Sequence, residues 1–417
     1  MKYVVILGDG MADFGIPELG GKTPLQAANK PYMDFLAQHG ELGMVKTVPD
    51  GIPPGSDSAN LSVFGYNPQV FYTGRSPLEA VSMGINLAPD DVAFRCNLVT
   101  LSGEDKYEEK IMLDYSSDEI STEESAQLIN AVNDSLGSNT HVFYPGISYR
   151  HCMVWKHGPN EFDLTPPHDI LERRIGDYMP TGSEYAEIIA SYMKASVDIL
   201  KDHPVNLARI ARGLNPATSI WIWGNGKRPS IPLFKDKYGL DGSVISAVDL
   251  IKGIGLCAGM KSIDVEGVTG NIHTNFKGKA DAAIKELENG SDFVYVHVEA
   301  PDECGHRYEI ENKVRSIELI DEFIVGPILA ALEKYDEYKV LLLPDHPTPL
   351  SLRTHTSDPV PYALYHGCHG RDSGDGSSEV CDSGQLSGTV VKYDEVSAKS
   401  TGVYIYDGYT LMDKLCK

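Results

Sequence analysis

An aspartate and a histidine stand side by side at the end of an apolar run, in the segment LLLPDHPTP (341–349). Asp345 and His346 are poor packing residues for the end of a buried strand, but they are good metal ligands. Other apolar runs and loops place similar residues at similar positions, and these are Asp9, Asp302, His306 and His355. Together the six residues indicate a metal site.

A mixed set of carboxylates and imidazoles suits Mn²⁺, Zn²⁺, Fe²⁺ or Co²⁺ better than Ca²⁺. Six such residues exceed the share of one ion, whereas two ions about 4 Å apart would use them all, as in two-metal phosphoryl-transfer sites. Each residue also has a simpler interpretation: Asp9 as a turn or cap residue, Asp302 and His306 as a surface pair, and His355 as a hydrogen-bonded loop histidine. The joint pattern favours ligands, because ligand sites in an open parallel sheet lie beyond the C-terminal ends of its strands.

The segment PPGSDSANL (53–61) offers a nucleophile. Gly55 permits a tight turn before Ser56, and the short helix expected to follow would direct backbone N–H groups at a phosphate. A serine hydroxyl is a poor nucleophile at neutral pH, but beside a metal ion it can lose its proton and attack phosphorus. Asn60 could donate a further hydrogen bond. The alternative is an ordinary helix N-cap in a Ser/Asp loop.

Cationic residues next to Gly, Pro or aromatic residues stand out in so acidic a chain, whose formal net charge is -23. Planar Arg side chains suit the carboxylate and phosphate groups of a small anionic substrate. For any one of them, a solvated or acid-paired side chain is the alternative. The candidates are Arg75, Arg95, Arg150, His151, Arg173, Arg174, Lys227 and Arg228.

The net charge argues against nucleic acid or an anionic membrane as the main partner. The seven cysteines are scattered and odd in number, and no CxxC occurs, which indicates a reduced chain. The N-terminal apolar run is too short for a signal peptide, and no apolar run reaches the ~18 residues of a membrane span. We therefore expect a cytoplasmic protein.

The elements that must position these residues alternate between apolar strands and amphipathic helices, which predicts an α/β fold with a mostly parallel central sheet flanked by helices. A length of 417 residues favours two domains. Near residue 90 the pattern changes to half-exposed strands and one amphipathic helix, which predicts a small inserted α+β unit. The pattern returns to α/β from about 183, with a strand at 219–227 and a helix at 310–334. The Gly/Ser/Asp-rich segment 366–384 is expected to be a mobile loop without an assigned role.

Ten stretches, in this order and spacing, resemble the alkaline-phosphatase superfamily and, within it, the archaeal type of cofactor-independent (2,3-bisphosphoglycerate-independent) phosphoglycerate mutases. They cover essentially the whole chain and read ILGDGMAD, ELGGKTPLQAANKPYMD, PPGSDSANLSVFGY, YTGRSPLEA, PGISYRH, WGNGKRP, SAVDLIKGIG, APDECGH, PDHPTP and THTSDPVP. The resemblance implies an alkaline-phosphatase-like catalytic domain at 1–90 and 175–417, with a small α+β substrate and lid domain inserted at 91–174. It also implies an isomerase of glycolysis and gluconeogenesis that interconverts 3-phosphoglycerate and 2-phosphoglycerate without 2,3-bisphosphoglycerate.

The same resemblance makes Ser56 the nucleophile that becomes phosphoserine. It implies two divalent ions, expected to be Mn²⁺, with Co²⁺, Zn²⁺ or Mg²⁺ as alternatives. One ion would be held by Asp9, Ser56, Asp345 and His346, and the other by Asp302, His306 and His355. Glycerate must stay bound while it turns, which requires cationic side chains on its carboxylate and a lid that excludes water.

Within the inserted unit, we expect His151 to carry the proton at the leaving oxygen and Arg150 to hold the carboxylate. Further substrate contacts are expected from Asn60, Arg75, Arg95, Arg173 and Lys227. The loop after the nucleophile reads GSDSANL, where the better-known form of the mutase keeps a longer acidic motif.

The archaeal branch also contains members proposed as homoserine kinases. A homoserine-kinase-like phosphotransferase or a phosphohydrolase therefore remains an alternative enzyme. A non-catalytic metal-binding protein is disfavoured, because all seven predicted ligand positions carry competent residues. A homo-oligomer is left open.

Overall fold

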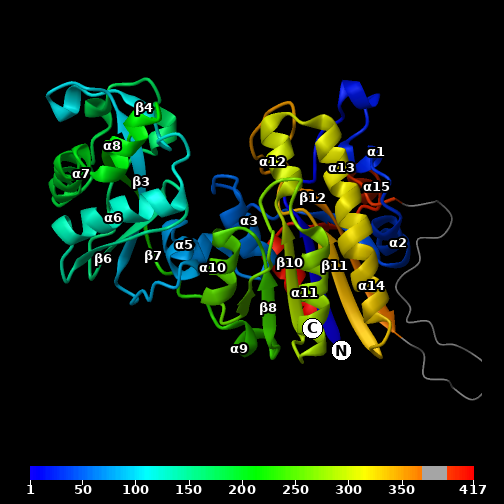
Figure 1. Cartoon of the computed structure of the whole chain (residues 1–417). Coiled ribbons are helices and arrows are strands. Elements are labelled where there is room, and N and C mark those ends of the chain that lie inside the picture. The colour runs from blue at the N-terminus through cyan, green and yellow to red at the C-terminus, as the bar shows by residue number, and fades with distance from the viewer. Residues whose placement is uncertain (369–391) are drawn as a thin grey trace, which may run out of the picture. The chain divides into compact units, whose positions relative to one another are not determined.

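The computed structural model describes residues 1–368 and 392–417. The chain divides into two compact units: unit 1 comprises Met1–Tyr72 and Ile231–Lys417, and unit 2 comprises Thr73–Ser230 (Figure 1). The insertion predicted at 91–174 lies inside unit 2, which extends further at both ends.

Unit 1 contains an eight-stranded sheet in the order β13-β2-β12-β11-β1-β10-β8-β9. Neighbouring strands are parallel except that β12 is antiparallel to both its neighbours, so the sheet is mostly parallel, as predicted. The strands are β1 (Lys2–Gly8), β2 (Glu41–Val45), β8 (Gly242–Ile245), β9 (Lys261–Ile263), β10 (Phe293–Val298), β11 (Glu337–Leu343), β12 (Val360–Cys368) and β13 (Tyr404–Ile405).

Helices cover both faces of this sheet, which is why the central strands β1 and β10 are apolar almost throughout. One face packs against α2 (Pro31–His39), α11 (Phe276–Glu288), α13 (Ile310–Ile320) and α14 (Gly326–Leu332) (Figure 1). The helix predicted at 310–334 is α13 and α14 joined by a π-helical turn, Asp321–Val325.

The other face packs against α3 (Ser56–Val63) and α10 (Asp249–Cys257). Phe64, which ends α3, stacks on Tyr295 of β10 with 4.0 Å between the ring centroids. This contact fixes α3 over the centre of the sheet. The remaining helices of unit 1 are α1 (Pro24–Ala27), α4 (Pro68–Phe71), α9 (Phe234–Tyr238), α12 (Ala300–Arg307), α15 (Glu395–Ser400) and α16 (Leu411–Cys416).

Unit 2 has a five-stranded antiparallel sheet in the order β4-β3-β6-β5, with β7 also paired to β3. The strands are β3 (Val92–Leu101), β4 (Met112–Asp114), β5 (His141–Tyr144), β6 (Arg150–Trp155) and β7 (Ser219–Lys227). The helices are α5 (Ser76–Ser82), α6 (Thr122–Leu136), α7 (Ala186–Lys201) and α8 (Pro204–Ala211). Because β7 pairs with β3 and not with the parallel sheet, unit 2 continues to Ser230.

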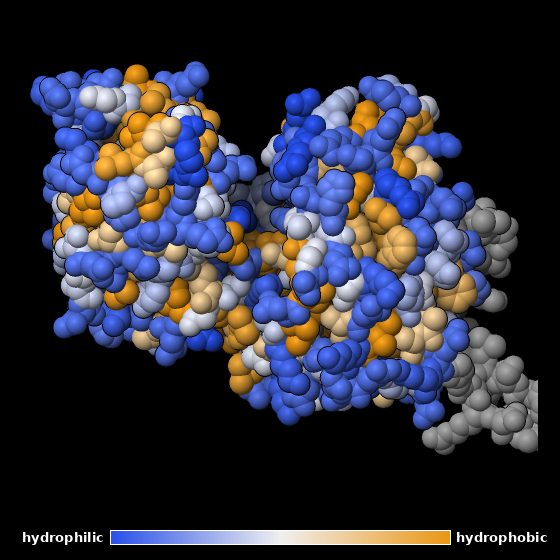
Figure 2. All heavy atoms as spheres, in the orientation of Figure 1, coloured by the Kyte–Doolittle hydropathy of each residue, from blue (hydrophilic) through white to orange (hydrophobic). Residues whose placement is uncertain are grey.

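Hydrophilic residues spread over the face shown in Figure 2, and apolar residues form scattered spots on it. Among the residues described, no helix is long and apolar enough to cross a bilayer. Of the segment 366–384, the first three residues end β12 and the others lie outside the described residues. Among the described residues, the cysteines that form no disulfide bond are Cys96, Cys152, Cys257, Cys304 and Cys416.

Candidate active site and metal centre

Ser56 opens helix α3 at the end of the proline-containing loop. A Cβ on Gly55 would lie 2.7 Å from Asp57 Oδ1, so a side chain at this position would displace that carboxylate. The Tyr72 hydroxyl donates to Asp57 Oδ2 at 2.5 Å and steadies the residue after the serine. The Ser56 hydroxyl lies 3.1 Å from His346 Nε2. The loop therefore presents a hydroxyl, at the positive end of a helix, to a predicted metal ligand.

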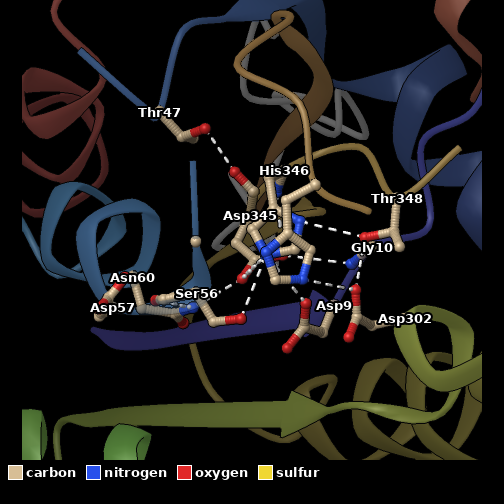
Figure 3. A network of polar contacts seen from close by, with 12 residues as sticks. Asp9, Gly10, Thr47, Ser56, Asp57, Asn60, Asp302, Asp345, His346 and Thr348 are labelled. Carbon is tan, nitrogen blue, oxygen red and sulfur yellow. Dashed lines mark hydrogen bonds and ion pairs between the residues drawn. The ribbon is translucent and has the colours of Figure 1, made fainter. Parts of the chain in front are cut away.

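The first ligand cluster consists of Asp9, Asp345 and His346 (Figure 3). These residues follow β1 and β11, which are parallel neighbours, so positions just beyond their C-terminal ends lie close together. His346 Nε2 is 3.5 Å from Asp9 Oδ1 and 3.4 Å from Asp345 Oδ2. The three ligand atoms lie within 4.8 Å of one another, which is close enough to share one ion.

The second cluster consists of Asp302, His306 and His355. Asp302 and His306 are one helical turn apart on α12, which begins just after β10. Asp302 carboxylate oxygens lie 3.2 Å from His306 Nε2 and 3.4 Å from His355 Nε2, and the two Nε2 atoms are 2.9 Å apart. His306 donates its Nδ1 proton to the carbonyl of Arg353 at 3.0 Å, so a cation bound in the cluster would replace the proton that Nε2 shares with Asp302.

Both clusters fit divalent cations by their own chemistry. Asp9 Oδ1 is buried and has no hydrogen-bond partner among the described residues. The Nε2 atoms of His306 and His355 point at each other, and a cation would accept the lone pairs of both. Carboxylate and imidazole donors together suit a transition-metal ion. All seven ligands predicted from the sequence lie in unit 1 and come together in these two clusters with Ser56.

The pKa shifts of the clustered carboxylates also favour bound cations. Burial and the charges of Asp345 and Asp302 raise the pKa of Asp9 well above its usual range. Burial alone would raise the pKa of Asp302, but hydrogen bonds from His306 and His355 outweigh it and hold that pKa well below its usual range. Buried carboxylates so close together repel one another, and bound cations would remove the repulsion.

Gly10 and Thr348 connect the two clusters. Gly10 has a φ of 62° and donates its N–H to Asp345 Oδ1 at 3.2 Å. A Cβ at this position would lie 2.7 Å from Thr348 Oγ1 and 2.8 Å from Asp302 Oδ1, so glycine is required. The Thr348 hydroxyl donates to Asp302 Oδ1 and accepts from His346 Nδ1 at 3.3 Å. One hydroxyl thus orients a ligand of each cluster.

Asn60 makes its contacts within the candidate metal site. It lies one turn after Ser56 on α3 and is fully buried. Its amide donates to the Ser56 carbonyl and to Asp345 Oδ2, both at 2.8 Å, while its Oδ1 accepts from the Tyr295 hydroxyl at 2.6 Å. Both amide hydrogens therefore bond within the site, and the expected contact between Asn60 and the substrate stays a prediction.

Three of the predicted arginines gather in unit 2 around Glu79 on α5. Arg95 forms a two-point ion pair with Glu79, its Nε 2.8 Å from Oε2, and lies 4.6 Å over the ring of Trp223. Arg75 lies 4.0 Å from the same carboxylate. Burial would raise the pKa of Glu79, but the charges of Arg95, Arg75 and Arg150 lower it. Three guanidinium groups against one carboxylate leave a cationic patch suited to an anion.

The other two cations expected to contact the substrate, Arg173 and Lys227, lie elsewhere on unit 2. Arg173 is exposed and donates to the Tyr178 hydroxyl at 3.1 Å. Lys227 ends β7 opposite Val92, and its charge acts on Asp90. Neither belongs to the patch around Glu79.

His151 lies on the opposite face of the unit 2 sheet from Arg150, because successive residues of a strand point to opposite faces. Its Nδ1 accepts the Gly146 N–H at 3.0 Å, and its Nε2 is buried without a partner among the described residues. Burial lowers the pKa of His151 to about 3. With Nδ1 accepting, the neutral ring keeps its one proton on Nε2, and the proton transfer expected of His151 stays a prediction.

We expect His151→Gln to change turnover by less than the roughly 10²–10⁴-fold that a general acid contributes. The pH profile of kcat should keep the same limbs, because the pKa of about 3 lies below the working range. His141→Gln is the matched control, since His141 is a partly buried strand histidine whose Nε2 also lacks a partner among the described residues. A loss above a hundredfold in the His151 variant alone, with one limb of the profile gone, would support the predicted role.

Sequence reasoning missed several residues that hold the site together, among them His297, Thr348 and Glu79. His297 carried a signal, since a histidine inside the apolar run FVYVHV is a poor core residue. Burial lowers its pKa well below the usual range, so it is neutral. Its partner, however, lies 288 positions away in the sequence and follows only from the strand pairing.

The fold and the site together define a class of protein. A serine at a helix N-terminus, beside two carboxylate–imidazole clusters at the C-terminal edge of a parallel sheet, is typical of enzymes that transfer phosphoryl groups with two metal ions.

Comparison with known proteins gives the family within that class. Residues 37–206 match the family model described as 2,3-bisphosphoglycerate-independent phosphoglycerate mutase. A probable mutase of this kind from Geobacter sulfurreducens is 50% identical over 415 residues, which cover 100% of this chain and 99% of the relative. The mutase of Methanosarcina barkeri is 52% identical over 367 residues, or 88% of this chain and 90% of the relative. The chain belongs to the 2,3-bisphosphoglycerate-independent phosphoglycerate mutase family.

Solved structures agree with this assignment. A Pyrococcus horikoshii protein has a TM-score of 0.78 and 29% identity, covering 99% of this chain and 96% of that chain. The cofactor-independent phosphoglycerate mutase of Thermoplasma acidophilum has a TM-score of 0.65 and 27% identity, covering 100% and 99%.

Proposed function

We propose that this protein is an isomerase that interconverts 3-phosphoglycerate and 2-phosphoglycerate without 2,3-bisphosphoglycerate, through a phosphoserine at Ser56. The observation that carries the proposal is the Ser56 hydroxyl, which opens α3 and lies 3.1 Å from His346 Nε2 beside a buried carboxylate cluster. Membership of the family supports the choice of substrate. The cytoplasm is the proposed location, because glycolysis and gluconeogenesis turn over these phosphoglycerates there.

Two divalent cations would complete the site. When bound, they would stabilise the deprotonated serine oxygen and the negative charge on the phosphoryl group. Mn²⁺ is the proposed ion, with Co²⁺, Zn²⁺ and Mg²⁺ as alternatives. The proposed ligands are Asp9, Ser56, Asp345 and His346 for one ion, and Asp302, His306 and His355 for the other.

Ser56 and the N-terminus of α3 then have defined roles in the two phosphoryl transfers. Ser56 Oγ loses its proton and forms a bond to phosphorus as the bond from phosphorus to O3 of the substrate breaks, and O3 takes up one proton in exchange. The O2 hydroxyl of the same glycerate then loses its proton as it takes back the phosphoryl group, and Ser56 Oγ regains one proton, which restores the serine. The positive end of α3 favours the negative phosphoserine in between.

Glycerate must not leave, and water must not replace it, while the phosphoryl group is on the serine. We assign its carboxylate to the patch formed by Arg75, Arg95 and Arg150. Arg95 is already oriented by Glu79 and Trp223, so little side-chain entropy is lost when an anion binds. Unit 2 is the proposed lid, because a site that admitted water would hydrolyse phosphoserine and act as a phosphatase.

A coupled assay tests the proposal. Purified full-length protein is mixed with Mn²⁺ and 3-phosphoglycerate without bisphosphoglycerate, and enolase reports the 2-phosphoglycerate formed. We expect an enolase signal without free phosphate, its loss after chelation, and its return with Mn²⁺. Release of phosphate in place of the signal would identify a phosphohydrolase. ADP formation from homoserine and ATP, without mutase activity, would identify a homoserine-kinase-like enzyme.

A further inference from the structure

A buried histidine lies next to the first ligand cluster without belonging to it. His297 sits on β10, between β8 and β1, and none of its surface is exposed. It is paired with Leu7 of β1, two residues before Asp9. Ser246 follows β8, whose last residue is paired with Val296. Ser246, His297 and Asp9 therefore stand in a row across the C-terminal ends of three neighbouring parallel strands.

In each hydrogen bond along this row, the donor lies on the side of Ser246 and the acceptor on the side of Asp9. The Ser246 Oγ accepts the Val248 N–H at 2.9 Å, so its own proton is free to point at His297 Nδ1, 3.2 Å away. With Nδ1 accepting, Nε2 carries the proton of the ring. That N–H donates to Asp9 Oδ2 at 3.0 Å. The serine thus selects the tautomer that bonds to the carboxylate.

The hydrogen bond from His297 gives the two carboxylate oxygens of Asp9 different roles. Oδ2 is used by the histidine, whereas Oδ1 is buried, has no partner among the described residues and faces His346 Nε2 at 3.5 Å. Without the bond, the carboxylate could rotate about χ2 and present either oxygen, or both. A metal ligand is most effective when a neighbouring donor fixes its orientation.

We propose that His297 is a positioning residue for the first metal site: with its tautomer set by Ser246, it holds Asp9 so that Oδ1 alone faces the cation. The Lys279 ammonium donates to the His297 carbonyl at 2.7 Å and fixes the main chain from α11. The inference rests on the proposed function, because the cation it serves is part of that function. It adds His297, with its proton on Nε2, as a residue that supports the first metal site without being one of the proposed ligands.

A purely structural role makes a different prediction. If His297 only filled space, a phenylalanine of similar shape would affect stability and leave metal binding unchanged. A positioning role predicts a selective loss at the one site that contains Asp9. The second cluster is an internal reference, because Asp302, His306 and His355 form no hydrogen bond with His297 among the described residues, and Asp302 acts on His297 only through its charge.

The experiment titrates metal-free full-length protein with Mn²⁺ and measures free Mn²⁺ by electron paramagnetic resonance. For His297→Phe we expect one site to weaken by roughly 10–100-fold, the range for loss of a group that orients a ligand, and the other site to keep its affinity. His297→Gln should recover most of the affinity, because its amide N–H can reach Asp9. Ser246→Ala should weaken the same site to a smaller degree. Ser243→Ala, which removes another buried hydroxyl of β8, should bind like the wild type.

Wild-type affinity at both sites in His297→Phe would overturn the inference, and so would equal weakening of both sites that follows the loss of melting temperature. If the phenylalanine variant does not fold, Ser246→Ala decides: unchanged binding at both sites overturns the inference, and weakening at one site supports it. A wild-type protein that binds no divalent cation would overturn the proposed function itself, so the two failures are distinguishable.

Discussion

Ser56→Ala should abolish the conversion of 3-phosphoglycerate while leaving the fold and most of the metal binding intact. The alanine lacks the oxygen that is proposed to accept the phosphoryl group, and loss of a nucleophile typically costs roughly 10⁴–10⁶-fold in turnover. The other ligands of the first cluster remain, and among the described residues the hydroxyl makes one side-chain hydrogen bond, to His346 at 3.1 Å. Little packing is lost when it is removed.

Three measurements check this prediction. The coupled enolase assay gives turnover, Mn²⁺ titration gives the number of bound ions, and mass spectrometry of the acid-quenched protein looks for phosphate on the peptide that contains Ser56. Ser58→Ala is the matched control, because its buried hydroxyl lies on the same helix and donates only to main-chain carbonyls of Pro53 and Gly55. If Ser56→Ala keeps measurable mutase activity, the phosphoryl group does not pass through this serine.

The metal clusters could be predicted from the sequence because their geometry follows from a one-dimensional pattern. Apolar runs that end in Asp mark the C-terminal ends of β1 and β11, and the run followed by DxxxH marks the end of β10. These three strands are adjacent and parallel, so their ends meet without any further information. The mostly parallel fold of unit 1 follows from the same runs.

The residues around the ligands could not be predicted in this way, because their roles depend on strand register and burial. His297 reaches Asp9 only because β10 is paired with β1 in one particular register. Asn60 follows the nucleophile by four positions, which indicates a shared helix face, but the sequence does not show that Asp345 covers that face. Strand β7 belongs to unit 2 because it pairs with β3, which is distant in the sequence. The inserted unit therefore extends beyond its predicted boundary.

Arg150 and His151 are a different case, because the sequence alone already sets the directions of their side chains. Adjacent residues on a strand point to opposite faces, so these two neighbours on β6 leave the sheet on opposite sides. Arg150 is exposed and His151 is buried, and their expected roles at one substrate stay predictions. A resemblance in sequence placed the two residues near the site, and strand geometry separates their side chains.

Asp345→Asn is expected to remove the first metal ion and at least roughly 10³-fold of the turnover, the upper range for loss of a single preorganised electrostatic group. Asp345 is fully buried and accepts hydrogen bonds from the Gly10 N–H at 3.2 Å, its neighbour's N–H at 2.9 Å and the Asn60 amide at 2.8 Å. An asparagine loses the charge, and in either orientation its NH₂ group faces one of these donors. It can therefore replace neither the ligand nor the acceptor.

The stability of the metal-free protein should nevertheless change little in this variant. The donor that is left unpaired costs about 1–3 kcal/mol, but removal of the Asp345 charge relieves Asp9, whose pKa is raised first by burial and then by that charge. The effect should appear on adding Mn²⁺. An ion at 100 times its Kd stabilises the wild type by about 2.7 kcal/mol, and each tenfold loss of affinity removes about 1.4 kcal/mol of that gain.

Melting curves with and without Mn²⁺ separate these contributions. Asp321→Asn is the matched control, because Asp321 is a buried carboxylate in the same unit that accepts the main-chain N–H groups of Tyr32 and Met33. The control should lose stability with and without Mn²⁺ alike and keep its activity. Asp345→Asn should lose the part of the stabilisation that Mn²⁺ provides through the first cluster. Full Mn²⁺ stabilisation in an inactive Asp345→Asn would mean that this carboxylate serves the reaction without holding a cation, because a neutral amide in a dry pocket cannot replace a charged ligand.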